Sequence, residues 1–438
     1  MSTDRSIVPP IRDFDILSLP PATDYDVTQR VKIRLIKCGN VPVNRITVMF
    51  DHGLCGQYGE DAGSILDYRL GALLTAPLLS EGCHGHSAAD IAARLDFEGA
   101  MMQPSVARHF TSVSLLSTNS STPQLLPLLL DVMTRPTFSE DAYAAIRSKA
   151  AQNRATQLSR IGMLASEGAD LHLYGAAHPY NVLPTPAEIN ATTLDNVRRY
   201  HESILMASDV TIIVSGPVDD SLAKHIRQFG IELSARLHSP ALKTTDIVAA
   251  VPEAPLRRHI AVENSLQTAV SMAFPVDITR DNTDYPGLRA AAIALGGYFG
   301  SRLMTNIREK KGLTYGIGAA LSGERGTTAL TIDAQCTAGS ADLVIDEINA
   351  EIKRLCTEPM GVAELQQLRS FIESSLASTL DNHFSIGEYY TTMLQVGIPH
   401  DYYDRQWRML KALTPDVIRT LADSYISGVP AIAVTAGA

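Results

Sequence analysis

The segment SRLMTNIREKKGLTYGIG, residues 301–318, changes from a helical to a strand pattern within a few residues. Arg308 and Lys311 lie where the last turn of a helix is expected, and cations there interact favourably with the helix dipole. Gly312 is a typical helix terminator because glycine adopts positive φ without steric cost. Tyr315 then opens an apolar stretch that is typical of a strand. We expect a helix that turns back into a sheet and brings Tyr315 towards Arg308.

The patterns around this segment recur in the first half of the chain. Two strand patterns recur: residues 268–274 correspond to an early strand, and 328–335 correspond to 112–117. Two helical patterns also recur: residues 285–311 correspond to the stretch at 60–79, and 341–355 correspond to the helix before Thr134. We interpret them as an internal duplication of roughly 200 residues per copy, which is too long for a solenoid repeat. Each copy mixes strands with long helices, which predicts an α+β fold: two similar domains, each an antiparallel-rich mixed sheet with long helices on one face.

The expected organisation has four parts. Residues 34–50 alternate apolar and polar around a Gly-Asn turn, which predicts a hairpin, and residues 209–215 (DVTIIVS) predict a buried strand. Prolines mark the stretch from 234 to 254 as the connection between the copies. The predicted parts are an N-terminal extension (1–30), a first domain (31–235), a linker (236–256) and a second domain (257–438).

The composition excludes several classes of protein. The chain has 438 residues, 45% of them hydrophobic, and a formal net charge of −10, which argues against a nucleic-acid-binding surface. Its five cysteines are scattered without Cys-x-x-Cys spacing, so neither a disulfide framework nor a zinc ribbon is expected. No run approaches the roughly 18 apolar residues of a membrane span. The start lacks the pattern of a secretory signal, so the expected location is the cytoplasm, or the periplasm if a leader preceded this sequence.

The order of several landmarks resembles the pitrilysin or insulinase-type family of zinc peptidases, in its half-length, processing-peptidase-like branch. The resemblance runs from about residue 34 to the C-terminus, and its most specific part is the segment at 301–318. The other landmarks are Glu81-Gly82 followed by SAADIAARLDFEGA, Arg135-Pro136-Thr137-Phe138, His178-Pro179-Tyr180 and Ser215-Gly216. The resemblance implies two peptidase-like domains, the first carrying a degenerate metal site.

In active members of that family, an inverted His-x-x-Glu-His motif and a distant glutamate bind zinc, and the glutamate inside the motif is the general base. Aligned through Glu81-Gly82, the motif falls on Leu73-Leu-Thr-Ala-Pro77. Leu73 and Pro77 replace the histidines, Ala76 replaces the base, and residues 141–166 contain no glutamate. The resemblance therefore implies no catalytic set and no metal cofactor in this chain. Pro77 is also expected to end or kink the helix near Ala76.

The resemblance assigns a different role to Arg308 and Tyr315. In the family, an Arg and a Tyr at this spacing hold the substrate backbone and help to stabilise the tetrahedral intermediate. A guanidinium and a phenol can both donate hydrogen bonds to a developing oxyanion. The alternative is structural, with Arg308 at a helix C-terminus and Tyr315 as an ordinary strand aromatic.

We therefore predict the zinc-free subunit of a two-chain metallopeptidase. A zinc-bearing subunit of the same family would supply the metal and the base, and this chain would supply Arg308 and Tyr315 to the peptide substrate. The alternative is a noncatalytic scaffold or peptide-binding homo-oligomer, such as a homodimer. A third possibility is an autonomous metallopeptidase that uses His84 and His86.

Two further motifs are interpreted as structural. Adjacent donors in a short loop rarely converge on one tetrahedral metal, so we favour a polar loop for the cluster Glu81, Cys83, His84, His86 and Asp90. Gly296-Gly297 lies in a helical pattern and lacks the Gly-Lys-Ser/Thr ending of a phosphate loop, which indicates packing or flexibility.

Overall fold

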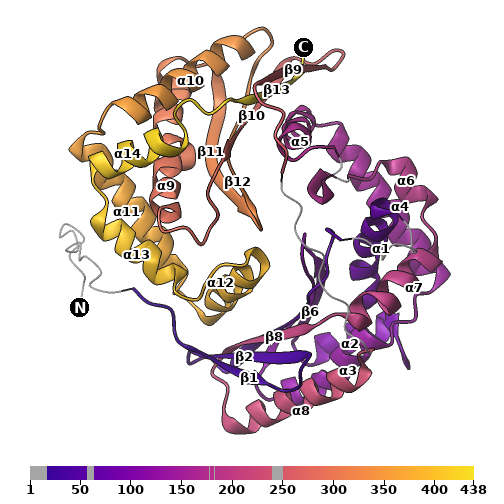
Figure 1. Cartoon of the computed structure of the whole chain (residues 1–438). Helices are drawn as coiled ribbons and strands as arrows, with labels where there is room; N and C mark the ends of the chain where they lie inside the picture. Colours follow the sequence, from indigo (N-terminus) through magenta and orange to yellow (C-terminus); the bar gives the residue numbers. More distant parts are fainter. Residues whose placement is uncertain (1–16, 57–63, 177, 182, 239–249) are drawn as a thin grey trace, which may run out of the picture.

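The computed structural model describes residues 17–56, 64–176, 178–181, 183–238 and 250–438. Figure 1 shows two sheets facing the middle of the molecule, with most helices on the outside. This arrangement confirms the predicted α+β fold with two similar, antiparallel-rich halves. No helix in the described part of the chain combines the length and apolar character needed to cross a lipid bilayer.

The first half contains eight strands and eight α-helices in its described residues. The strands are β1 (Ala22–Asp26), β2 (Val31–Lys37), β3 (Val43–Phe50), β4 (Gly82–Cys83), β5 (His86–Ser87), β6 (Met101–Val106), β7 (Thr111–Thr118) and β8 (Val210–Gly216). The helices are α1 (Ile65–Leu78), α2 (Ala88–Phe97), α3 (Thr122–Thr134), α4 (Glu140–Leu158), α5 (Ile161–Tyr174), α6 (Pro186–Ala191), α7 (Leu194–Ser203) and α8 (Asp220–Arg236). Strand β1 lies inside the segment predicted as an N-terminal extension and pairs with β2.

The second half contains five strands in its described residues, together with six α-helices and two π-helices. The strands are β9 (Leu256–Ala261), β10 (Gln267–Val276), β11 (Thr314–Glu324), β12 (Thr327–Thr337) and β13 (Ile432–Gly437). The α-helices are α9 (Tyr285–Ala292), α10 (Ala341–Thr357), α11 (Val362–Ser378), α12 (His383–Val396), α13 (Tyr402–Ala412) and α14 (Pro415–Tyr425), and the π-helices are η4 (Ile293–Gly297) and η5 (Met304–Lys310).

The strand orders of the two large sheets reveal the duplication directly. The first sheet runs β1-β2-β8-β3-β7-β6, and the second, read from its other edge, runs β9-β13-β10-β12-β11. In each sheet one pair is parallel, β2 with β8 and β9 with β13, and the other neighbours are antiparallel. Apart from β1, the sheets match strand for strand, and β10 and β12 are the counterparts of β3 and β7, as the sequence pattern predicts.

The predicted hairpin at residues 34–50 is wrong in its pairing. Strands β2 and β3 do form there, but β8 lies between them and pairs with both. The connection from 38 to 42 is long enough to cross one intervening strand, since neighbouring strands lie about 4.8 Å apart. The Gly-Asn pair predicts only a local change of chain direction. The order of the strands depends instead on the apolar β8, which is buried between β2 and β3.

Each sheet is covered on its inner face by a helix from the other half of the chain. Helix α5 packs on β10 and β13, where an added Cβ at Gly168 would lie 2.9 Å from the Val434 side chain. Helix α12 packs on β8 and β3, where Ile386 and Tyr390 join a buried apolar cluster. Figure 1 shows both helices inside the curve of the molecule. The two halves therefore share their cores.

The single helix predicted over residues 285–311 is interrupted. Helix α9 passes into the π-helix η4, and the chain is extended at Tyr298 before η5 begins. Gly296 lies against β11, because an added Cβ would be 2.5 Å from the backbone nitrogen of Ala319. Gly296 thus allows η4 to pack closely on β11, in keeping with the packing role predicted for Gly296-Gly297.

Candidate functional site

Arg308 is positioned by the π-helix η5, which ends at Lys310. The wider helical turn is closed by a hydrogen bond from the Lys311 amide to the Asn306 carbonyl. Gly312 follows with φ +62°, and nothing lies near a Cβ added there, so its role is the turn itself. Short π-helical segments are frequent at functional sites because the extra residue redirects side chains.

The structure brings Arg308 and Tyr315 together. The Arg308 Nε donates a hydrogen bond of 2.9 Å to the Tyr315 carbonyl oxygen. Its guanidinium carbon lies 4.7 Å from the centre of the Phe299 ring and 5.7 Å from the centre of the Tyr315 ring. Contacts over ring faces are favourable for a cation. The two rings therefore fix the orientation of the guanidinium.

The two aromatic rings of this cluster face solvent. Tyr315 is 91% exposed and Phe299 is 63% exposed, although both are large hydrophobic side chains. Tyr315 also lines a cavity of about 660 Å³ between α5 and the second sheet, together with Ser166 and Gln335. Asp333 lies in the same cavity, and burial raises the pKa of its carboxyl group. Tyr315 thus borders a cavity that several polar side chains line.

The predicted metal positions lie on the last turns of α1. Leu73 and Pro77 are partly exposed and line a second cavity, of about 400 Å³, whereas Ala76 is 1% exposed and buried in the core. Helix α1 ends one residue after Pro77, close to the predicted end at Ala76. None of the three side chains carries a metal-donor atom.

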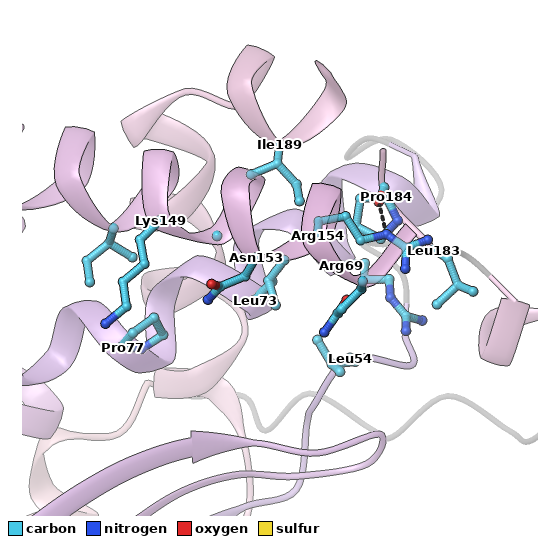
Figure 2. Close-up of a pocket in the computed structure, with 13 residues that line it drawn as sticks. Leu54, Arg69, Leu73, Pro77, Lys149, Asn153, Arg154, Leu183, Pro184 and Ile189 are labelled. Atoms are coloured by element: carbon cyan, nitrogen blue, oxygen red, sulfur yellow. Dashed lines mark hydrogen bonds between the residues drawn. The ribbon is translucent and has the colours of Figure 1, made fainter. Parts of the chain in front are cut away.

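The opposite wall of that cavity is also unsuited to zinc. Helix α4 faces α1 across it with Lys149, Asn153 and Arg154 (Figure 2). Arg154 is held by an ion pair with Glu167 of α5, so that carboxylate is already engaged. Two cations would repel Zn²⁺, and the described lining residues include no free carboxylate to offset them. The residues present therefore do not fit the metal that active family members bind.

The cluster before α2 does not assemble a metal site either. Cys83 is buried in the core, while His84 and His86 are exposed. The Asp90 carboxylate instead accepts hydrogen bonds from the backbone and hydroxyl of Ser87 at the start of α2. Across the described residues, no group of three or more His, Cys, Asp or Glu side chains is arranged to hold a metal ion.

Arg69 and Lys149 were not among the residues predicted from the sequence, yet they line the same cavity as Leu73 and Pro77. Arg69, Leu73 and Pro77 are spaced by four residues and so share one face of α1. Helical periodicity alone could have placed the arginine beside the degenerate positions. It could not have shown that Arg69 is buried.

The comparisons with known proteins agree with this picture. Residues 191–371 match a family described as "Peptidase M16 inactive domain". An uncharacterized zinc protease of Streptomyces coelicolor is 21% identical over 373 residues, which cover 82% of this chain and 78% of that protein.

Two solved structures show the same fold. The crystal structure of a peptidase M16 inactive domain from Pseudomonas fluorescens has a TM-score of 0.83 at 24% identity, covering 95% of this chain and 98% of that one. The periplasmic protease PqqL from Escherichia coli has a TM-score of 0.74 at 17% identity, covering 98% of this chain and 48% of that one.

Proposed function

Because the chain is an inactive member of the pitrilysin-type (M16) peptidase family, we propose that it is the zinc-free subunit of a two-chain peptidase. A zinc-bearing subunit of the same family supplies the metal and the general base. This chain supplies Arg308 and Tyr315, which donate hydrogen bonds to the substrate backbone and to the oxyanion that forms on the scissile carbonyl. The metal-donor positions are replaced here, whereas the Arg-Tyr pair is kept.

The exposure of Tyr315 carries this proposal. A 91% exposed tyrosine beside a guanidinium leaves its phenol free to meet a partner or a peptide, whereas a tyrosine kept for packing is normally covered. The length of PqqL is also in keeping with a paired unit, since this chain covers only about half of that protease.

The test is a peptide-cleavage assay with the partner that copurifies with the tagged chain from its native source. Loss of one oxyanion donor typically lowers kcat by about 100- to 1,000-fold. We expect losses of this size for Arg308→Ala and Tyr315→Phe, and none for Lys310→Ala, an exposed cation of the same helix. Equal cleavage by all four proteins would refute the assigned roles.

A second candidate is a noncatalytic scaffold or peptide-binding homo-oligomer. The observation that favours it is the stacking of Arg308 on Phe299 together with its bond to the Tyr315 carbonyl, which gives the arginine a purely structural role. A homodimer that copurifies with no peptidase, and whose stability falls in Arg308→Ala, would support this candidate.

A further inference from the structure

The cavity at the degenerate metal positions has a charge opposite to that of the whole chain. Arg69, Lys149 and Arg154 line it, and no Asp or Glu is among the described residues that do so. The formal net charge of the protein is −10, so a purely cationic lining does not follow from composition. Figure 2 shows Arg69 and Arg154 at one end of the cavity and Lys149 beside Pro77 at the other.

Arg69 is the unusual member of this lining because it is buried and has no counter-ion among the residues that the structure describes. Its side chain is only 7% exposed, and its Nη1 donates to the Pro179 carbonyl at 2.9 Å. In the described part of the chain it forms no ion pair, whereas Arg154 is paired with Glu167. A buried charge without a partner costs considerable free energy.

The groups around Arg69 do not compensate this charge. Burial raises the pKa of the neighbouring Cys55 thiol to about 11, so the thiol is neutral at pH 7. Burial lowers the pKa of Arg69, and the guanidinium groups of Arg108 and Arg154 act in the same direction, whereas Cys55 opposes them through its charge interaction and a hydrogen bond. The local field at this end of the cavity is therefore positive and suited to an anion.

We propose that this cavity binds the C-terminal end of a peptide, with the terminal carboxylate on Arg69 and an apolar last side chain on Leu73 and Pro77. A guanidinium matches a carboxylate with two parallel hydrogen bonds. The volume of about 400 Å³ lies within the range of small-ligand pockets.

The polar part of the lining favours a peptide over a simple fatty acid. The exposed side-chain amides of Asn153 and Gln157 line it, and an amide both donates and accepts, as a peptide bond does. Ile146 and Ile189 add apolar surface to the lining. A peptide backbone can form hydrogen bonds with both amides, whereas a hydrocarbon chain can bond to neither.

The site is complete within this chain and needs neither a partner subunit nor the Arg308-Tyr315 pair. Binding can be measured on the isolated full-length protein by titration calorimetry. The probes are the peptide acetyl-Ala-Ala-Leu with a free carboxylate, the same peptide as its C-terminal amide, and sodium acetate. A bond to a charged group is typically worth tenfold or more in affinity, so we expect the free acid to bind at least tenfold more tightly than the amide. The free acid should also bind at least tenfold more tightly than acetate, because acetate has the carboxylate but lacks the apolar side chain and the peptide bonds.

Three variants locate the binding. Arg69→Met removes the charge and Leu73→Trp fills the cavity, so each should weaken binding of the free acid at least tenfold. Arg69→Lys keeps a positive charge and should retain part of the affinity. Arg419→Met, on α14 in the other half, is the matched control and should bind as the wild type does. Circular dichroism and urea unfolding confirm that each variant is folded.

If Arg69→Met does not fold, Arg69→Lys and Leu73→Trp still decide the question. Equal affinity for acid and amide, or unchanged binding in Leu73→Trp, would overturn the proposal. Acetate that binds as tightly as the peptide would also overturn it, because it would reveal a general anion site without a peptide pocket.

Discussion

At the residue scale, burial sets several ionisable groups between the two halves away from their ordinary pKa values. Burial raises the pKa of Asp170 on α5 to about 6, against the opposing charge of Arg108. It lowers the pKa of His109 to about 4, with Arg325 and Arg108 acting in the same direction. These residues come from both halves, so no local sequence window predicts their proximity. By contrast, the loss of metal donors at Leu73 and Pro77 follows from residue type once the family resemblance has placed the metal motif on these positions.

Asp170 gives a prediction with a definite sign. An Asp has a pKa near 3.9 when unfolded, so between about pH 4 and 6 the folded chain binds more protons at this site and its stability falls as pH rises. Asp170→Asn removes this cost. We expect the stability of the variant relative to the wild type to increase from pH 4 to pH 7, by about 1–3 kcal/mol. Urea unfolding at both pH values measures it, and a pH-independent difference contradicts it.

The wild-type curve alone would hide this effect. The lowered pKa of His109 makes stability rise with pH between about 4 and 6.5, which opposes the contribution of Asp170. The informative quantity is therefore the difference between variant and wild type at each pH.

Gly296 gives a second prediction at this scale. A Cβ there would lie 2.5 Å from the Ala319 backbone nitrogen, which cannot move without shifting β11. We expect Gly296→Ala to lower the free energy of unfolding by about 1–3 kcal/mol, as overpacking does. Gly361→Ala is the control, because nothing lies within 4 Å of a Cβ added at Gly361. If both variants had equal unfolding midpoints in urea, the close packing of η4 on β11 would be refuted.

At the element scale, the sequence predicts helices and strands well but not where the helices pack. Helices α5 and α12 were not among the elements predicted from the sequence, and their own residues do not say which sheet each one covers. The switch from helix to strand at residues 301–318 was predictable because Gly312 is a local signal. The π-helical turn η5 that directs Arg308 was not, since η5 packs against β11, a contact that no local signal in the sequence specifies.

The docking of α12 on the first sheet can be tested at Gly387. An added Cβ would lie 2.3 Å from the Ser215 hydroxyl and 2.9 Å from its Cβ. Gly387→Ala should therefore destabilise the protein by about 1–3 kcal/mol. Ser215→Gly removes both contacting atoms, so the double variant should lose less stability than the sum of the single variants. Strict additivity in urea unfolding would show that the two residues do not touch.

At the scale of the whole molecule, the duplication was predictable because strand and helix patterns recur in order, and the sheet topologies repeat strand for strand. The interlocking of the halves was not predictable, because it arises from contacts between distant segments. Arg108 of the first half pairs with Glu324 of the β11–β12 hairpin at 2.7 Å. Arg45 of β3 pairs with Glu388 of α12 at 2.8 Å.

These contacts make the halves depend on each other for stability. The domain boundaries that we propose, 31–235 and 257–438, place α5 in the first unit and α12 in the second, although each helix covers the sheet of the other unit. A chain cut between 238 and 250 should therefore yield two fragments that copurify when they are expressed together. Each fragment expressed alone should expose the inner face of its sheet and bind a hydrophobic dye such as ANS.

Circular dichroism and dye binding on the separate and joint fragments measure this dependence. The pair should unfold in one transition, at a urea concentration below that of the intact chain, because association adds an entropic cost that the covalent linker removes. Fragments that fold independently, bind no dye and fail to associate would show that α5 and α12 cover sheets that are already stable. In that case the shared cores would not couple the two halves.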